Sequence, residues 1–303
     1  MTYAELHRGP LHGIRVVSMA VNLPGPLAAA RLQALGAAIT KVEPPGGDPA
    51  ASISQEWYLD LVAGQEVITL DLKDPGDREL FDECLDHADL LLTASRPSGL
   101  ARLGLSWEAL HAAFPLLCQV AIVGYGAGRE HVPGHDLTYQ AGTGVLTPPL
   151  MPRVLIADAA GAERVTSEAV SLLLARARGY GTGYAQVSLA EVAEDFAESF
   201  RRGVTRPGGV LGGGHPGYSI YSSLDGYVAV AALEPHFWRR LVSELGIDDG
   251  GESARTSMAA ILKSRTSTFW ERWAAKRDLP LVALPAEDLP PHPAEASTEL
   301  GKR

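Results

Sequence analysis

Short apolar runs alternate with longer amphipathic segments through the first two thirds of the chain. Runs rich in Val, Ile and Leu are typical of buried strands, and segments in which Ala and Leu recur at helical spacing are typical of helices. The expected strands span residues 13–19, 38–43, 66–72, 89–93, 117–123 and 185–189. The expected helices span residues 27–35, 75–88, 105–114, 159–178 and 191–202. Strands and helices that alternate across short links predict a Rossmann-like α/β domain with a mostly parallel sheet covered on both faces.

The pattern changes after a Gly/Pro-rich segment, residues 201–216, which indicates a domain boundary, a moving loop or only a flexible linker. Residues 218–231 alternate in polarity around Asp225-Gly226 and predict a β-hairpin. Three helices and a last strand-like run are expected at 234–245, 257–263, 267–277 and 279–285. We therefore expect a large domain over residues 1–205, a smaller α+β domain over 206–285 and a flexible tail over 286–303.

Composition restricts the classes of function. The 303 residues are 46% hydrophobic and 20% charged, as in ordinary soluble globular proteins, and the formal charge of −10 argues against a broad nucleic-acid surface. No apolar run reaches membrane-spanning length and the N-terminus has no signal-like apolar region, so a cytoplasmic protein without a membrane partner is expected. The two cysteines, Cys84 and Cys118, lack the spacing of a metal site or of a disulfide framework.

The loop after the first expected strand argues against one obvious class of enzyme. A strand, a Gly/Pro turn, a helix and a second strand ending in an acid, Glu43, resemble the start of a nicotinamide-binding fold. However, residues 21–26 read V-N-L-P-G-P and lack the GxGxxG fingerprint. Pro24 and Pro26 also remove N–H donors that a pyrophosphate would need, so a nicotinamide-dependent dehydrogenase is disfavoured.

The segment from Gly134 to Gly161 carries the most unusual chemistry. His135 and Asp136 follow a glycine, and Asp158 is expected to end a strand-like run, Val154–Ile156, and to open a helix. A helix N-terminus favours an ionised carboxylate, which suits a nucleophile or a base. Three structural alternatives stay open: Asp158 as a helix cap only, His135 as a buried core histidine, and Asp136 as a turn residue.

Ligands of parallel α/β sheets bind at the carboxyl ends of the strands. The expected strands place four candidate residues at that edge, Gly25, Arg96, Gly124 and Asp158. The neighbours Pro26 and Tyr125 are added as candidate ligand-binding residues, and no metal site is expected.

Several stretches, in this order and spacing, resemble the class III CoA-transferase superfamily, and most closely its α-methylacyl-CoA racemase branch. The matching stretches are Gly9–Ala30, Leu35–Glu43, Val67–Lys73, Arg96–Leu105, Gly134–Leu146 and Asp225–Trp238. The resemblance implies an interlocked homodimer, with each active site between the large domain of one chain and the small domain of the other. It also implies an acyl-CoA thioester as substrate and no prosthetic group.

The resemblance assigns roles to three residues, and the chemistry that it implies suggests a role for a fourth. Racemases of the family use the aspartate matching Asp158 as an acid and base, with the histidine matching His135 on the other face of the α-carbon and the glutamate matching Glu234 orienting it. The backbone N–H of Asp136 is expected to receive the enolate oxygen. Three readings remain open: a racemase, a transferase in which Asp158 is the nucleophile, and a non-catalytic relative.

This chain departs from the family at positions that usually contact CoA phosphates. Pro44 and Pro45 follow Glu43 where a basic residue is usual, and residues 62–66 lack the usual basic turn, which leaves Arg96 as the expected phosphate contact. Another thioester carrier, a truncated thioester or a free small acid therefore stays open as the ligand.

Overall fold

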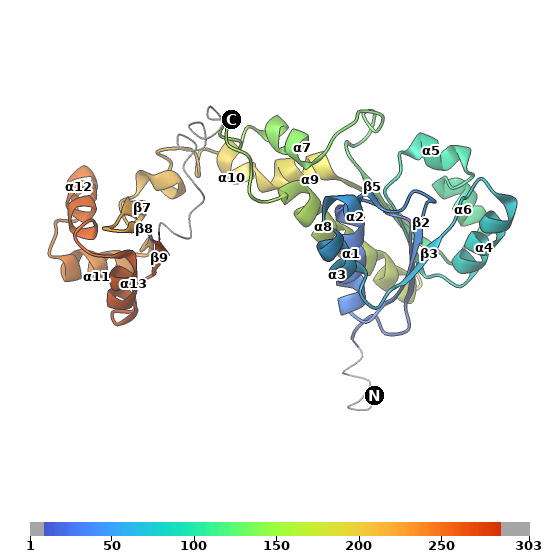
Figure 1. Ribbon diagram of the computed structural model, residues 1–303, viewed down its shortest axis with the longest axis horizontal. Helices are drawn as coiled ribbons and strands as arrows, with labels where there is room; N and C mark the ends of the chain where they lie inside the picture. Colours follow the sequence, from blue (N-terminus) through green and yellow to red (C-terminus); the bar gives the residue numbers. More distant parts are fainter. Residues whose placement is uncertain (1–8, 286–303) are drawn as a thin grey trace, which may run out of the picture. The chain divides into compact units, whose positions relative to one another are not determined.

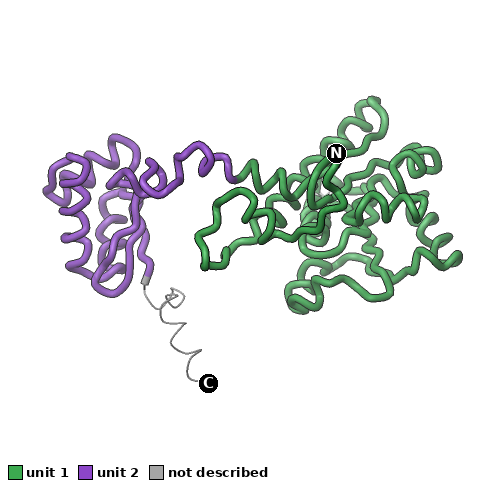
Figure 2. The backbone as a smooth tube through the Cα atoms, turned by 90° about the horizontal axis from the view of Figure 1, so that it is seen from above, with its two compact units in different colours: residues 1–196 green, residues 197–303 purple. Residues whose placement is uncertain are grey.

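The computed structural model describes residues 9–285, which divide after Phe196 into two compact units (Figure 2). The boundary expected after residue 205 falls inside the second unit. The tail expected over residues 286–303 lies outside the described residues.

The first unit is built on a six-stranded sheet in which every neighbouring pair is parallel, which confirms the Rossmann-like α/β prediction. The strands are β1 (Arg15–Ser18), β2 (Ala38–Glu43), β3 (Glu66–Thr69), β4 (Leu90–Thr93), β5 (Cys118–Val123) and β6 (Tyr184–Ser188). Their order is β3-β2-β1-β4-β5-β6, so the chain changes direction across the sheet between β1 and β4. A crevice opens at the carboxyl ends of the strands at such a switch point.

Helices cover both faces of this sheet (Figure 1). The helices of the first unit are α1 (Pro24–Ala34), α2 (Pro49–Ile53), α3 (Gln55–Val62), α4 (Pro75–Asp86), α5 (Pro97–Arg102), α6 (Trp107–Ala113), α7 (Asp136–Thr143), α8 (Ile156–Ala177) and α9 (Leu189–Phe196). Small residues of α1 and α8, among them Ala28 and Ala162, pack on one face. Larger side chains of α4, α5 and α6 (Phe81, Leu100 and Leu110) fill the other face. Burial of these apolar side chains stabilises the layered arrangement.

The structure corrects several expected elements. Residues 44–65, to which the apolar pattern assigns no strand or helix, contain α2 and α3, whose N-caps are the side chains of Asp48 and Ser54. Polar residues and Pro are common in loops, but they are also common at the first positions of helices, and here they begin α2 and α3. The helix expected over 191–202 is instead two helices, α9 and α10 (Glu198–Arg201), and α5 is a further helix between β4 and α6.

The second unit is a small α+β fold. Strands β7 (Tyr218–Ser222), β8 (Gly226–Ala231) and β9 (Leu281–Pro285) form an antiparallel sheet in that order, which confirms the predicted hairpin. The other elements are α11 (Pro235–Leu245), α12 (Gly251–Leu262), α13 (Ser267–Ala275) and a π-helical turn, η1 (Val210–Gly214). Side chains such as Val228, Leu241 and Trp270 form a core separate from that of the first unit.

Candidate active site

A pocket of about 270 Å³ lies at the carboxyl edge of the parallel sheet in the first unit. It takes its walls from the loop after β1, the ends of β4 and β5, and the starts of α7 and α8. Its lining residues are Val21, Asn22, Pro24, Ala94, Arg96, Ile122, Val123, Gly124, Glu130, Val132, Pro133, Gly134, His135, Tyr139, Asp158 and Leu189. The pocket thus occupies the switch point between β1 and β4, where α/β folds bind ligands.

The structure brings four of the predicted site residues together in this pocket, namely Arg96, Gly124, His135 and Asp158. The other five are not part of its lining: Gly25, Pro26, Tyr125, Asp136 and Glu234. Glu234 belongs to the second unit, where it is exposed at the N-cap of α11. Its expected role beside His135 stays a prediction.

Gly25 and Tyr125 have structural surroundings instead. A Cβ on Gly25 would lie 2.6 Å from the Cβ of Ala20, so α1 can start so close to β1 only with glycine there. Pro26 is buried in the first turn of the same helix. The ring of Tyr125 meets that of Tyr139 edge to face at 5.3 Å, and the Arg129 guanidinium lies 4.2 Å from its centroid.

Asp158 lies in the first turn of α8, but the local structure differs from the expected one. The helix begins at Ile156 with Leu155 as its N-cap, and Val154 is exposed rather than part of a strand. Apolar residues that precede a helix start do not need to form a strand, and these do not. As the third helical residue, Asp158 is not the cap of α8, so the cap-only interpretation is wrong.

The cap of α8 comes from Asp136, twenty-odd residues earlier in the chain. Its carboxylate accepts the backbone N–H groups of Ala157 at 2.8 Å and of Asp158 at 3.1 Å. The second oxygen accepts the side-chain amide of Gln140 at 2.5 Å. Asp136 is 4% exposed and is the first residue of α7, so the turn expected at this position is a helix start. Its carboxylate therefore joins the starts of the two helices that carry His135 and Asp158.

Burial, which is the larger cause, and the negative charge of the neighbouring Asp136 carboxylate together raise the pKa of Asp158 from 3.8 to about 7. The expectation that the helix N-terminus keeps Asp158 ionised is therefore wrong. The physical reason is that burial disfavours the ionised form of Asp158, while the helix N–H groups donate to Asp136, whose negative charge opposes a second one nearby. A carboxyl group with this pKa exchanges protons readily near neutral pH.

His135 is the N-cap of α7 and is exposed, so it is not a core histidine. Its backbone N–H donates to the hydroxyl of Thr138 at 3.0 Å, and that hydroxyl donates to the His135 carbonyl at 2.8 Å. These local bonds fix the backbone of His135, which lines the pocket.

Tyr139 is a pocket residue that the sequence interpretation missed. It is 4% exposed, and burial together with the nearby Tyr125, Asp158 and Asp136 raises its pKa to about 12. A Cβ on Gly124 would lie 2.5 Å from the Tyr139 hydroxyl, so the end of β5 can approach the ring only as glycine. The spacing of Tyr139 one helical turn after His135 and Asp136 was the available signal.

A second pocket, of about 360 Å³, lies beside the ends of β1 to β4. It is lined by Met19, Val21, Val42, Glu43, Pro44, Pro45, Leu70, Asp71, Leu72, Lys73, Ser95 and Leu103. Val21 belongs to both pockets, and Lys73 is the one cation of this second lining. Within the described residues 9–285, Arg96 on the first pocket and Lys73 on the second are thus the Arg and Lys side chains that the two linings offer to a phosphate.

Among residues 9–285, no group of three or more His, Cys, Asp or Glu side chains is arranged to hold a metal ion. No helix in the same range is long and apolar enough to cross a membrane.

Fold and pocket together define a doubly wound α/β protein with a carboxyl group and an imidazole on one pocket at the switch point. The chain belongs to CoA-transferase family III, whose sequence profile matches residues 11–283. It is therefore an enzyme of a family that acts on acyl-CoA thioesters, and the non-catalytic alternative is set aside.

Individual relatives include both kinds of enzyme in this family. A probable fatty acyl-CoA transferase of Mycobacterium tuberculosis, Rv3272, is 27% identical over 86% of this chain and 79% of its own length. Human alpha-methylacyl-CoA racemase is 31% identical over 78% of this chain and 65% of its own. The crystal structure of Rv3272 superposes with a TM-score of 0.80 at 25% identity, covering 96% of this chain and 90% of that one.

Proposed function

We propose that this enzyme is a racemase or epimerase acting at the α-carbon of an acyl-CoA-type thioester. The observation that carries the proposal is that His135 and Asp158 line one pocket while the pKa of Asp158 is raised to about 7. A proton donor and a proton acceptor are then both available at neutral pH.

Inversion at the α-carbon needs two groups, one on each face. In one direction neutral His135 removes the α-proton, the electron pair moves into the thioester carbonyl to form an enolate, and protonated Asp158 returns a proton to the opposite face. In the other direction ionised Asp158 is the base and the imidazolium is the acid. A carboxyl pKa near 7 leaves both forms of Asp158 populated, which suits a reversible reaction.

The enolate oxygen needs a donor, and the start of α7 supplies one. Asp136 is the first residue of this helix, where N–H groups have no intrahelical acceptor and the helix dipole favours negative charge. We assign the backbone N–H of Asp136 to this oxygen and its side chain to the cap of α8. Glu234 is assigned to fix the tautomer of His135, as a carboxylate hydrogen-bonded to an imidazole does.

The proposed active form is the interlocked homodimer, with Glu234 contributed by the partner chain. Co-expression of His135→Ala and Glu234→Ala chains tests this assignment, because one of the two sites in a mixed dimer then keeps both native residues. Activity above that of either variant alone is expected. The lack of such recovery in a demonstrated mixed dimer contradicts the shared site.

The reaction is tested by α-deuterium exchange. Each enantiomer of a 2-methylacyl-CoA is incubated with the enzyme in heavy water, and its mass and chirality are followed. Incorporation with loss of chirality is expected. His135→Ala and Asp158→Asn are each expected to abolish inversion but to keep exchange of opposite enantiomers, since each retains one base. A folded enzyme that binds the thioester and exchanges neither enantiomer contradicts the proposal.

Hydroxylamine trapping, carried out beside the exchange experiment, separates the racemase from the transferase alternative, which the similar transferases support. A transferase would form a thioester or anhydride on Asp158, and hydroxylamine would trap it as a hydroxamate at that residue. A trapped adduct together with transfer of CoA to a free acid, and no α-exchange, would replace the racemase assignment.

A further inference from the structure

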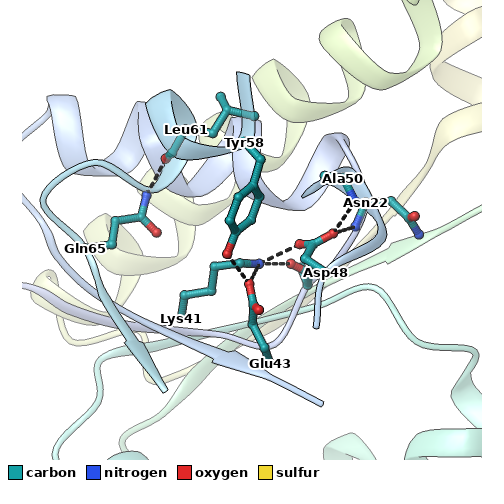
Figure 3. Close-up of polar contacts among 9 residues, drawn as sticks. Asn22, Lys41, Glu43, Asp48, Ala50, Tyr58, Leu61 and Gln65 are labelled. Carbon is teal, nitrogen blue, oxygen red and sulfur yellow. Dashed lines mark hydrogen bonds and ion pairs between the residues drawn. The ribbon is translucent and has the colours of Figure 1, made fainter. Parts of the chain in front are cut away.

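A buried ionic cluster lies behind the wall that the two pockets share. It joins Lys41 and Glu43 of β2 to Asp48, the N-cap of α2, and to Tyr58 of α3 (Figure 3). The side chains of Lys41 and Asp48 are completely buried, and that of Glu43 is 10% exposed. The sequence interpretation gave Lys41 and Asp48 no role, and the proposed proton transfers do not use them.

The contacts within the cluster satisfy its buried charges. The Lys41 ammonium lies 2.7 Å from the Asp48 carboxylate and 3.6 Å from that of Glu43. The Tyr58 hydroxyl donates to Glu43, and burial together with this carboxylate raises the pKa of Tyr58. A buried ion pair is weak evidence of stability, because an apolar pair of the same volume often stabilises a fold as well. A role of the cluster is therefore sought in its position beside the pockets.

Each end of the Lys41–Asp48 pair holds the loop that follows β1. The Asp48 carboxylate accepts the backbone N–H of Asn22 at 2.9 Å, and Lys41 donates to the carbonyl of Ala20 at 3.4 Å. Asn22 has φ 66°, in the left-handed region that non-glycine residues rarely adopt. A charge-assisted bond to its N–H holds this conformation.

The residues held in this way belong to the pockets themselves. Asn22 lines the pocket of His135 and Asp158, and Val21 lines both pockets. Figure 3 shows the side chain of Asn22 on the far side of its backbone from Asp48. Glu43 closes the cluster on the other side and lines the second pocket. The cluster thus fixes a loop whose residues line the two pockets.

We propose that Asp48, held by Lys41, is a positioning residue that fixes the backbone of Asn22 and so sets the affinity of the pocket for its acyl thioester. The identity of the ligand rests on the proposed function. The contacts that hold the loop do not depend on it. The positioning role places no proton transfer on either residue. Its signature is a rise in KM at nearly constant kcat, with the pH dependence due to Asp158 unchanged.

The test uses the Lys41→Met, Asp48→Asn double variant, which removes both charges and keeps the volume of the pair. Lys41→Met alone leaves the buried carboxylates of Asp48 and Glu43 without a cation and is expected to unfold. The double variant leaves only Glu43, which still accepts the Tyr58 hydroxyl. In the double variant, KM for a 2-methylacyl-CoA is expected to rise about tenfold, the equivalent of one weakened charge-assisted hydrogen bond. Amide hydrogen exchange of the peptide spanning residues 19–24 is expected to accelerate by a similar factor.

Asn22→Ala tests whether the cluster acts through this residue. Alone it is expected to raise KM by a similar factor, and in the double-variant background it is expected to add little, because coupled residues are non-additive. Full additivity of the two effects would show that the cluster does not act through Asn22.

A matched control lies at the opposite, amino-terminal edge of the sheet. Asp89 pairs with Arg176 at 2.5 Å and accepts the backbone N–H of Arg15 at 2.7 Å, so it bonds a cation and a backbone N–H as Asp48 does, in a pair that is partly exposed. Arg176→Met, Asp89→Asn is expected to leave both KM and the exchange of residues 19–24 unchanged. The inference is overturned if the cluster variant folds with native KM and native amide protection. Failure of the proposed function instead appears as absent α-exchange in the native enzyme, and the amide comparison still decides the positioning role.

Discussion

The carboxylate of Asp136 accepts the backbone N–H of Asp158 at 3.1 Å. The two acids therefore differ in their surroundings although they lie close together. The Asp136 carboxylate accepts the free N–H groups of α8 and the Gln140 amide. Asp158 is partly buried and lies near that negative charge. Environments that differ in this way separate the roles of two carboxyl groups, here into a helix cap and a proton-transfer group.

The raised pKa of Asp158 predicts the pH dependence of exchange on its face of the substrate. In His135→Ala, Asp158 is the remaining base, so only its ionised form removes the α-proton. Washout of α-deuterium into ordinary water is expected to rise with pH and to level off above about 7. A rate that is already level at pH 5 would contradict the raised pKa. Asp158→Asn measured in parallel gives the profile of the His135 face alone.

Asp136→Asn is expected to shift that profile to lower pH. The variant keeps an oxygen that can accept the N–H groups of Ala157 and Asp158, but it loses the oxygen that accepts the Gln140 amide and the negative charge that, next to burial, raises the pKa of Asp158. A shift of roughly one pH unit is expected, with a loss of about 1 kcal/mol in the free energy of unfolding from the weaker cap. Denaturant unfolding and the washout profile measure the two effects separately. An unchanged midpoint would show that burial alone sets the pKa.

The sequence predicted the sheet better than the site because a sheet depends on local pattern. Apolar runs identify β4 and β5 directly, since strands buried on both faces contain little else. The cap of α8 by Asp136 joins residues far apart in the chain, and no local pattern records it. Asp158 was therefore placed correctly at a helix start while its ionisation was predicted in the wrong direction.

Lys41 is a second residue whose surroundings the local sequence pattern does not predict. Within the run I-T-K-V-E a lysine reads as a residue on the exposed face of a strand, but its side chain is fully buried. Its partner Asp48 lies in a segment to which the apolar pattern assigns no strand or helix. Burial of a charge depends on where its partner lies in space, which spacing along the chain does not show.

The close approach of Gly124 to Tyr139 predicts a rescue between two variants. In Gly124→Ala the new Cβ would lie 2.5 Å from the Tyr139 hydroxyl, and the ring must move. We expect a loss of about 1–3 kcal/mol in the free energy of unfolding and at least a tenfold loss of exchange activity. Tyr139→Phe removes the clashing oxygen and leaves the next ring atom at 3.4 Å, so the double variant is expected to recover most of the stability. Thermal unfolding of the four proteins measures the coupling, and simple additivity would contradict it.

The pKa of Asp158 also predicts how stability depends on pH. Its pKa is raised in the folded state, from 3.8 to about 7, so the folded protein holds a proton that the unfolded chain releases. The group therefore imposes no penalty below pH 4, and stability falls as the pH rises between about 4 and 7. Asn at position 158 cannot ionise, so the Asp158→Asn variant escapes this penalty.

At pH 8 the free energy of unfolding of this variant is expected to exceed that of the native enzyme by on the order of 2 kcal/mol, after allowance for the partial exposure of the group. At pH 4 the two values are expected to be much closer. Denaturant unfolding at the two pH values measures the difference. Equal effects of the substitution at pH 4 and pH 8 would show that Asp158 ionises in the fold as it does in the unfolded chain.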